Sequence, residues 1–146
     1  FLRRLAKAAL NYPSAPSQLR RWLARTVGAS TDTHLELKRH GLSPFVDAAR
    51  VLALSAHISE ASTLLRLERL AEKGIISAKD AEVWSDAYGY LQLLRLQLHQ
   101  RQEAHQQPLT NTLALDDLNQ LHSRMLREAL RQLRYLQAFL TYRYRL

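Results

Sequence analysis

The side chains best suited to chemistry in this sequence form a basic cluster, Lys38, Arg39 and His40, which is followed by Asp47 and Arg50. Lys and Arg bind anionic groups such as phosphate and carboxylate, and Arg does so with a planar, two-pronged geometry. Asp47 and Arg50 are three residues apart, so on a helix they would be neighbours able to form an ion pair. Two interpretations follow: a basic lip over a cleft that receives an anionic ligand, or a solvated turn before a helix with one surface ion pair.

The residues after this cluster predict a turn and then a helix start. Gly41 allows backbone angles that other residues adopt only at a cost, so we expect the chain to turn there. Ser43 and Pro44 follow. This pair favours a helix start, because Ser can cap the first turn and Pro lacks only an N–H that the helix would not bond. An apolar helix is therefore expected from Pro44 to about Ala56.

The same stretch carries a resemblance to a known family. Residues 35–54, LELKRHGLSPFVDAARVLAL, resemble the signature of the putative nucleotidyltransferase substrate-binding domain. The resemblance covers nearly the whole chain and continues through residues 62–70 (STLLRLERL), 87–100 (AYGYLQLLRLQLHQ), Asn111 and 126–130 (LREAL). The family favours an acidic residue at Gly89 and Phe at Tyr90, so the chain departs from its pattern at that face.

The resemblance implies a helical, non-catalytic domain of a bacterial signalling protein, which follows a polymerase-β-like nucleotidyltransferase domain and often CBS or cyclic-nucleotide-binding domains. The upstream domain of the same polypeptide would bring the NTP, Mg²⁺ and catalytic carboxylates, while this domain closes the cleft and holds an acceptor of unknown identity. Lys38 and Arg50 would hold phosphate or carboxylate oxygens, and Gln100 would add a neutral hydrogen bond. Carried over position by position, the residues expected near the cleft are Lys38, His40, Arg50, Arg66, Arg95 and Gln100, with Arg66 and Arg95 in support.

The catalytic motif of nucleotidyl transfer is missing from the sequence. That motif is a Gly-Ser turn that holds the triphosphate, followed by an Asp-x-Asp pair that binds two Mg²⁺ ions. Gly28, Ser30 and Asp32 imitate the first half, but no Asp-x-Asp follows, and the adjacent acidic pair is Asp116-Asp117. The chain is therefore predicted to contain no catalytic residue, metal site or cofactor of its own.

Two further pairs have spacings that occur in active sites. Arg50 and His57 are seven residues apart, a spacing found in a family of helical ribonucleases, and His99 and Glu103 could supply two metal ligands from one helix face. Neither pair has a third partner nearby in the sequence. We interpret the first as a surface Arg and a helix-end His, and we do not expect a metal at the second.

Composition indicates one folded domain of ordinary size. A chain of 146 residues, 47% hydrophobic and 23% charged, is too apolar for disorder and too short for two cores. We expect a single helical domain over 1–146, with 1–33 as N-terminal helices and a loop leading into it. Because the chain begins at Phe1 rather than Met, a fragment of a longer protein is expected. The absence of Cys agrees with a cytoplasmic location, and no apolar run reaches the roughly 18 residues of a membrane span.

The charge balance is strongly basic, with 21 Lys and Arg against 13 Asp and Glu. Such an excess attracts nucleic acids, nucleotides, acidic proteins or anionic membranes without choosing among them. The last helix would collect Arg124, Arg127, Arg131 and Arg134 into a stripe of the kind that contacts phosphates. Aromatic residues are only 8% of the chain and most are assigned to the core, so nucleic acid is not expected as a partner. A solvated face, an acidic neighbouring domain and a homodimer remain open.

Apolar residues recur at helical spacing and no strand-like alternation appears, so an all-α bundle of five to seven helices is predicted. Two long antiparallel helices, at about 78–106 and 115–144, would form its frame, with the last one burying a seam that includes Leu121 and Met125. Gly89, in the first of them, would mark a close helix crossing or room for a ligand. The alternative function is a regulatory module that docks onto another protein without touching a substrate. Basic residues converging on a concave patch would favour substrate binding, whereas basic residues spread over a convex face would favour docking.

Overall fold

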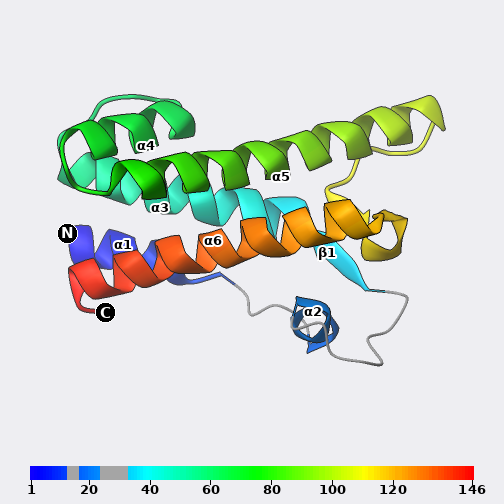
Figure 1. Cartoon of the computed structure of the whole chain (residues 1–146), viewed down its shortest axis with the longest axis horizontal. Coiled ribbons are helices and arrows are strands. Elements are labelled where there is room, and N and C mark those ends of the chain that lie inside the picture. Colours follow the sequence, from blue (N-terminus) through cyan, green and yellow to red (C-terminus); the bar gives the residue numbers. More distant parts are fainter. Residues whose placement is uncertain (13–16, 24–32) are drawn as a thin grey trace.

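The computed structural model describes residues 1–12, 17–23 and 33–146, and these residues form a helical bundle (Figure 1). The predicted all-α class is confirmed. The described helices are α1 (Leu2–Leu10), α2 (Ser17–Leu23), α3 (Ser43–Ser55), α4 (Thr63–Glu72), α5 (Ala78–Ala104) and α6 (Gln120–Tyr144). Within the N-terminal segment 1–33, for which helices and a loop are expected, residues 13–16 and 24–32 lie outside the described residues. No helix in the described part of the chain is long and apolar enough to cross a membrane.

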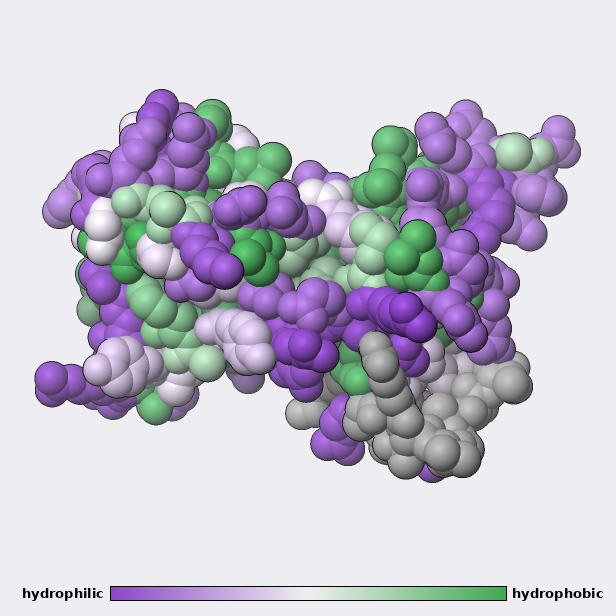
Figure 2. Space-filling view, in the orientation of Figure 1, coloured by the Kyte–Doolittle hydropathy of each residue, from purple (hydrophilic) through white to green (hydrophobic). Residues whose placement is uncertain are grey.

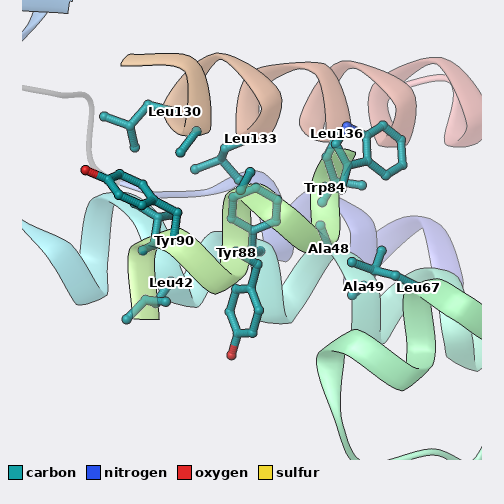
Figure 3. Close-up of a cluster of buried hydrophobic side chains, with 14 of the residues drawn as sticks. Leu42, Ala48, Ala49, Leu67, Trp84, Tyr88, Tyr90, Leu130, Leu133 and Leu136 are labelled. Carbon is teal, nitrogen blue, oxygen red and sulfur yellow. The ribbon is translucent and has the colours of Figure 1, made fainter. Parts of the chain in front are cut away.

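The frame of the bundle is the antiparallel pair α5 and α6, as predicted (Figure 1). Trp84 of α5 meets Phe139 of α6 edge-on with the ring centroids 5.9 Å apart, and Tyr88 of α5 meets Phe45 of α3 at the same distance. Figure 3 shows these α5 side chains between the leucines of α6 on one side and α3 on the other. The central helix α5 therefore packs against several neighbours, which explains why apolar residues cover so much of its circumference.

Helix boundaries follow local capping chemistry. Helix α4 ends before Gly74, whose φ of +70° is the left-handed conformation expected there. Helix α5 begins after Ser77, whose hydroxyl accepts a hydrogen bond from the Asp80 N–H at 2.9 Å. Helix α6 begins at Gln120 rather than Leu115, because Asn119 is its cap and its side chain accepts from His122 N–H at 2.8 Å.

The structure contains a short antiparallel sheet, although no strand is expected from the sequence. It pairs β1 (His34–Glu36) with β2 (Thr112–Ala114), and Leu35 lies opposite Leu113 with both side chains buried. A 3₁₀ turn, η2 (Leu115–Asp117), follows β2 and delays the start of α6. Strands of three residues hold at most one buried position each, which is too few for an alternating pattern to stand out.

The prediction of a turn at Gly41 and a cap at Ser43 is wrong. A π-helical turn, η1 (Lys38–Leu42), continues directly into α3, and Ser43 has helical angles of −61° and −42°. Gly41 lies against α5: a Cβ at this position would come within 3.2 Å of Leu91 Cδ1. The glycine is therefore explained by close packing of η1 on α5 and not by a reversal of the chain.

Two other packing expectations are also corrected. Gly89 is not a close helix crossing, because a Cβ added there would meet no atom within 4 Å. Leu121 and Met125 do not belong to the buried seam of α6, since they are 63% and 41% exposed. Leu126 and Leu130 are buried in their place.

Candidate functional site at the basic turn

The basic cluster lies on η1, one residue after β1, and the N-terminal end of its backbone is fixed by hydrogen bonds. The Glu36 carboxylate accepts hydrogen bonds from the backbone N–H groups of Lys38 (3.3 Å) and Arg39 (3.2 Å). Leu37 N–H donates to the carbonyl of Asn111 at 2.8 Å. An acidic side chain at the start of a helical turn satisfies N–H groups that have no partner within the turn. The side chains of Lys38 and Arg39 remain exposed and form no ion pair with a described residue.

Asn111 joins this turn to α5. Its Oδ1 atom accepts a hydrogen bond from Arg95 Nε at 3.0 Å and lies 3.2 Å from His99 Nε2. Arg95 and His99 are one helical turn apart, so a single side-chain oxygen holds two cationic or ionisable groups of the same helix face. The terminal nitrogens of the Arg95 guanidinium bond to nothing in the described part of the chain, so they remain available for an anion.

The loop that carries Asn111 is itself attached to α5 by Gln102. The Gln102 amide donates to Thr110 Oγ1 and accepts from Thr110 N–H, both at 2.9 Å. Gln102 is only 8% exposed. A buried amide without hydrogen-bond partners would destabilise the fold, and these two bonds satisfy it. Because they hold Thr110, they also position Asn111, the next residue of the loop.

Four of the six predicted residues lie on η1 and α5, the two segments that Asn111 joins. Lys38 is exposed on η1, and Arg95 is half-buried on α5. His40 is half-buried on η1, and its buried Nδ1 atom has no partner among the described residues. Gln100 is exposed on α5, beyond His99, and no described residue bonds to its amide.

Arg50 is positioned by a separate interaction between α1 and α3. Its guanidinium forms the predicted ion pair with Asp47 at 3.1 Å and is about half exposed. The other oxygen of Asp47 accepts a hydrogen bond from the Tyr12 hydroxyl. Burial, followed by this bond to a carboxylate, raises the pKa of Tyr12 above its ordinary value. Asp47 therefore connects α3 to Tyr12, which follows α1. Arg50 lies on the side of α3 that faces Tyr12.

Arg66 is not brought to the basic turn. Its Nε atom donates to the carbonyl of Glu60 at 2.7 Å, which fixes the loop before α4. Figure 1 shows α4 beside the first turns of α5, at the opposite end of the bundle from β1. The observed bond gives Arg66 a structural role at that end.

Two recesses lie beyond Asn111, between the last turns of α5 and the segment from β2 to α6. Their volumes are about 330 and 490 Å³, and both are lined by Leu98, Arg101 and Asp117. The Arg101 guanidinium and the Asp117 carboxylate lie 3.8 Å apart and form an ion pair between the two recesses. None of the six predicted residues lines either recess.

Sequence reasoning gave no role to Gln102, although a signal was present. The positions Leu91, Leu94 and Leu98 continue at helical spacing to Gln102, so a polar side chain occupies the next place in a buried apolar row. A polar residue in such a row predicts a buried hydrogen-bond partner. Asn111 was recognised as part of the family signature, and the structure adds its bonds to Arg95 and His99.

The two weaker active-site pairs do not assemble in the described residues. His57 follows the end of α3 with a φ of +57°, so it does not continue the helix face of Arg50. His99 is engaged with Asn111, and within residues 1–12, 17–23 and 33–146 no three His, Asp or Glu side chains gather as metal ligands do. What the basic turn offers instead is charge-assisted hydrogen bonding to an anion.

Comparison with known proteins agrees with the family resemblance. The sequence model of one family, described as the putative nucleotidyltransferase substrate binding domain, matches residues 1–144. No curated protein gives a significant match, and no solved structure does. The matched range includes η1, α5 and the Asn111 loop that joins them. The chain therefore belongs to the putative nucleotidyltransferase substrate-binding domain family.

Proposed function

We propose that this domain holds the acceptor for a nucleotidyl transfer that is catalysed by a preceding polymerase-β-like domain of the same polypeptide. The observation that carries the proposal is the link made by Asn111 between the basic turn and Arg95. That link supports a preorganised anion site, because hydrogen bonds hold the Arg95 guanidinium on one element and the backbone of Lys38 on another before any ligand arrives.

The division of labour would follow from the charges. The preceding domain would supply the NTP, Mg²⁺ and the carboxylates that bind it. Lys38 and the terminal guanidinium nitrogens of Arg95 would bind a phosphate or carboxylate group of the acceptor. This contact would orient the nucleophile of the acceptor toward the α-phosphate of the NTP. His40 and Gln100 would add hydrogen bonds. Arg50, already paired with Asp47, would contribute only at the edge of the site.

The test uses the full-length protein, labelled NTPs with Mg²⁺, and a cell extract that contains the acceptor. We expect Lys38→Ala and Arg95→Ala to lower labelling about tenfold or more each, because each removes a charge-assisted contact of about 1.5–3 kcal/mol. Lys79→Ala is the matched control, since Lys79 is exposed at the start of α5, away from η1. Undiminished labelling in both site variants would remove the basic turn from the acceptor site.

The alternative, a docking module without substrate contact, is supported by an exposed apolar pair on α5. Leu93 and Leu96 are 44% and 54% exposed, and Gly89, one turn earlier, leaves the same helix face uncovered. Figure 2 shows apolar surface over α5 amid hydrophilic residues. Under this alternative, Leu93→Gln with Leu96→Gln would abolish association with a partner domain, whereas Lys38→Ala would leave both association and transfer unchanged.

A further inference from the structure

Helices α1 and α6 carry almost all of the excess positive charge of the chain. Together they hold eight Lys and Arg and a single acidic residue, Glu128, whereas the rest of the chain holds thirteen basic and twelve acidic residues. Seven of the eight net charges therefore come from two helices that pack against each other. A bias of this size on one pair of elements creates a strongly positive potential over that surface.

The basic side chains of these helices face solvent, except that Arg127 is half-buried, donates from Nε to the Trp22 carbonyl at 3.1 Å and lies over the Trp22 ring. Arg124, Arg131 and Arg134 are exposed along α6, and Arg131 is paired with Glu128 at 2.9 Å. Arg124 and Arg134 form no ion pair with a described residue. The exposed Arg3 of α1 joins the same surface, because its guanidinium donates to the carbonyl of Arg145 at 3.1 Å.

Two tyrosines are exposed within this basic surface, and they are not among the aromatic residues of the core. Tyr135 is 54% exposed and Tyr142 is 85% exposed. They are seven residues apart, which places them on one face of α6 about 10 Å from each other. Tyr135 follows Arg131 by one turn, and Tyr142 precedes Arg145 by one turn. Beside Tyr142 lies an open recess of about 860 Å³ that is also lined by Arg143 and Arg145.

We infer that this surface of α6 and α1 binds single-stranded nucleic acid, with the arginines on phosphates and Tyr135 and Tyr142 stacked on bases. Proteins that bind single strands without sequence preference combine a positively charged track with aromatic platforms, and both are present here. A duplex keeps its bases stacked within the double helix, so its phosphates would contact the arginines while no base could stack on the tyrosines. This inference is independent of the acceptor site at the basic turn.

The surface fits other polyanions less well. A helix that lies on a membrane needs a continuous apolar face toward the lipid, but the apolar face of α6 is buried against α5 and α3. An acidic protein would neutralise the arginines and bury the tyrosines without the base stacking that the tyrosine variants below measure. Figure 2 shows this side of the molecule as mostly hydrophilic, with paler residues between the hydrophilic ones.

The test is fluorescence anisotropy of the whole chain with a labelled oligothymidylate of about 20 nucleotides, long enough to cover the helix face. We expect binding that weakens steeply as the salt concentration is raised to about 0.2 M. Arg134→Gln should lower the slope of log affinity against log salt by about 0.7, the value for one phosphate contact on a single strand. Lys79→Gln removes the same charge from the first turn of α5, which is not part of this surface, and should leave the slope unchanged.

The aromatic contribution is tested with Tyr135→Ala combined with Tyr142→Ala. We expect this variant to bind the oligonucleotide about thirtyfold more weakly or worse at an unchanged salt slope, because two stacking contacts of at least about 1 kcal/mol per base are lost. Leu93→Ala with Leu96→Ala is the matched control for loss of exposed side chains, and an unchanged helical dichroism spectrum shows that each variant is folded. Heparin, a polyanion without bases, should bind the tyrosine variant as well as it binds the native chain.

Three results would overturn the inference. The first is no detectable binding of the oligonucleotide even at low salt. The second is equal affinity of the tyrosine variant and the native chain for the oligonucleotide, which would leave a docking surface for acidic proteins. The third is an equal loss of affinity in Arg134→Gln and Lys79→Gln, which would show that only the overall charge matters.

Discussion

Replacing Asn111 with Ala tests the link between the basic turn and α5 most directly. The change removes the oxygen that accepts from Arg95 Nε at 3.0 Å and lies 3.2 Å from His99 Nε2. It leaves intact the Asn111 carbonyl that accepts from Leu37, since that group belongs to the backbone. Arg95 would keep its charge but lose the partner that orients it.

The size of the effect follows from the two lost bonds. A hydrogen bond to a charged group contributes about 1.5–3 kcal/mol and a neutral one about 0.5–1.5 kcal/mol. Arg95 and His99 are half-buried, so water replaces part of each interaction, and we expect a loss of about 2 kcal/mol. For a chain of 146 residues this corresponds to a fall in melting temperature of about 4–8 °C.

Thermal and urea unfolding followed by circular dichroism would measure this loss, with Asn111→Asp as the matched variant. The Asp variant keeps the accepting oxygens and adds a negative charge beside Arg95, so it should be at least as stable as the native chain at neutral pH. Its carboxyl should have a lowered pKa, so this stability is lost as the pH falls through that pKa. An Ala variant within about 0.5 kcal/mol of native, or an Asp variant as unstable as the Ala variant at neutral pH, would refute the reasoning.

The other predictions concern packing, titration and capping. Gly41→Ala should lower the free energy of unfolding by about 1–3 kcal/mol, because the new Cβ would lie 3.2 Å from Leu91. Gly89→Ala should raise the free energy of unfolding by about 0.5–1 kcal/mol, because no atom lies within 4 Å of the new Cβ and Ala favours the helix. Urea unfolding of both variants measures this contrast. Burial raises the pKa of Tyr90 to about 12, so the stability that comes from its protonated hydroxyl is present below the ordinary value near 10 and is lost as the pH rises through about 12. Tyr90→Phe should remove that alkaline dependence, which is read from melting temperatures across alkaline pH. Asn119→Ala should cost about 1 kcal/mol through loss of the α6 cap, and an equal melting temperature would show that the cap contributes nothing.

Helix patterns were readable from the sequence where apolar spacing and capping residues agree. Helix α4 (Thr63–Glu72) is such a segment: its leucines recur at helical spacing, Ser62 caps its start and Gly74 ends it with a positive φ. The antiparallel frame was also predicted, since both long helices have sustained periodicity. In these segments, local preference and tertiary packing favour the same structure.

The segments that were predicted wrongly are those in which contacts between distant residues decide the local conformation. Gly41 was assigned to a turn, but its packing on Leu91 depends on a residue fifty positions later. The strands were missed because Leu35 and Leu113 are buried only as a pair. The exposure of Tyr135 on α6 likewise depends on which face of that helix its neighbours cover.

The candidate site shows the same limit. Lys38 and Arg95 could be singled out as cations of the family signature, but residue type and spacing do not reveal which cations share a hydrogen-bond acceptor. Arg66 has the same chemistry, yet its guanidinium is engaged with the Glu60 carbonyl at the α4 end of the bundle. Hydrogen-bond partners across the fold, rather than residue type, distinguish these arginines.

The pairing of β1 with β2 affects the stage of folding at which the basic turn, η1, can form. Because residues 34–36 meet 112–114, residues 37–111 form a closed loop of about 75 residues whose two ends meet beside Lys38. Closing a loop of that length costs roughly 4 kcal/mol of chain entropy, which has to be offset by contacts already formed elsewhere. The basic turn is thus expected to assemble late in folding, after the α3–α5 segment has collapsed, and a short peptide spanning residues 34–54 should not reproduce it.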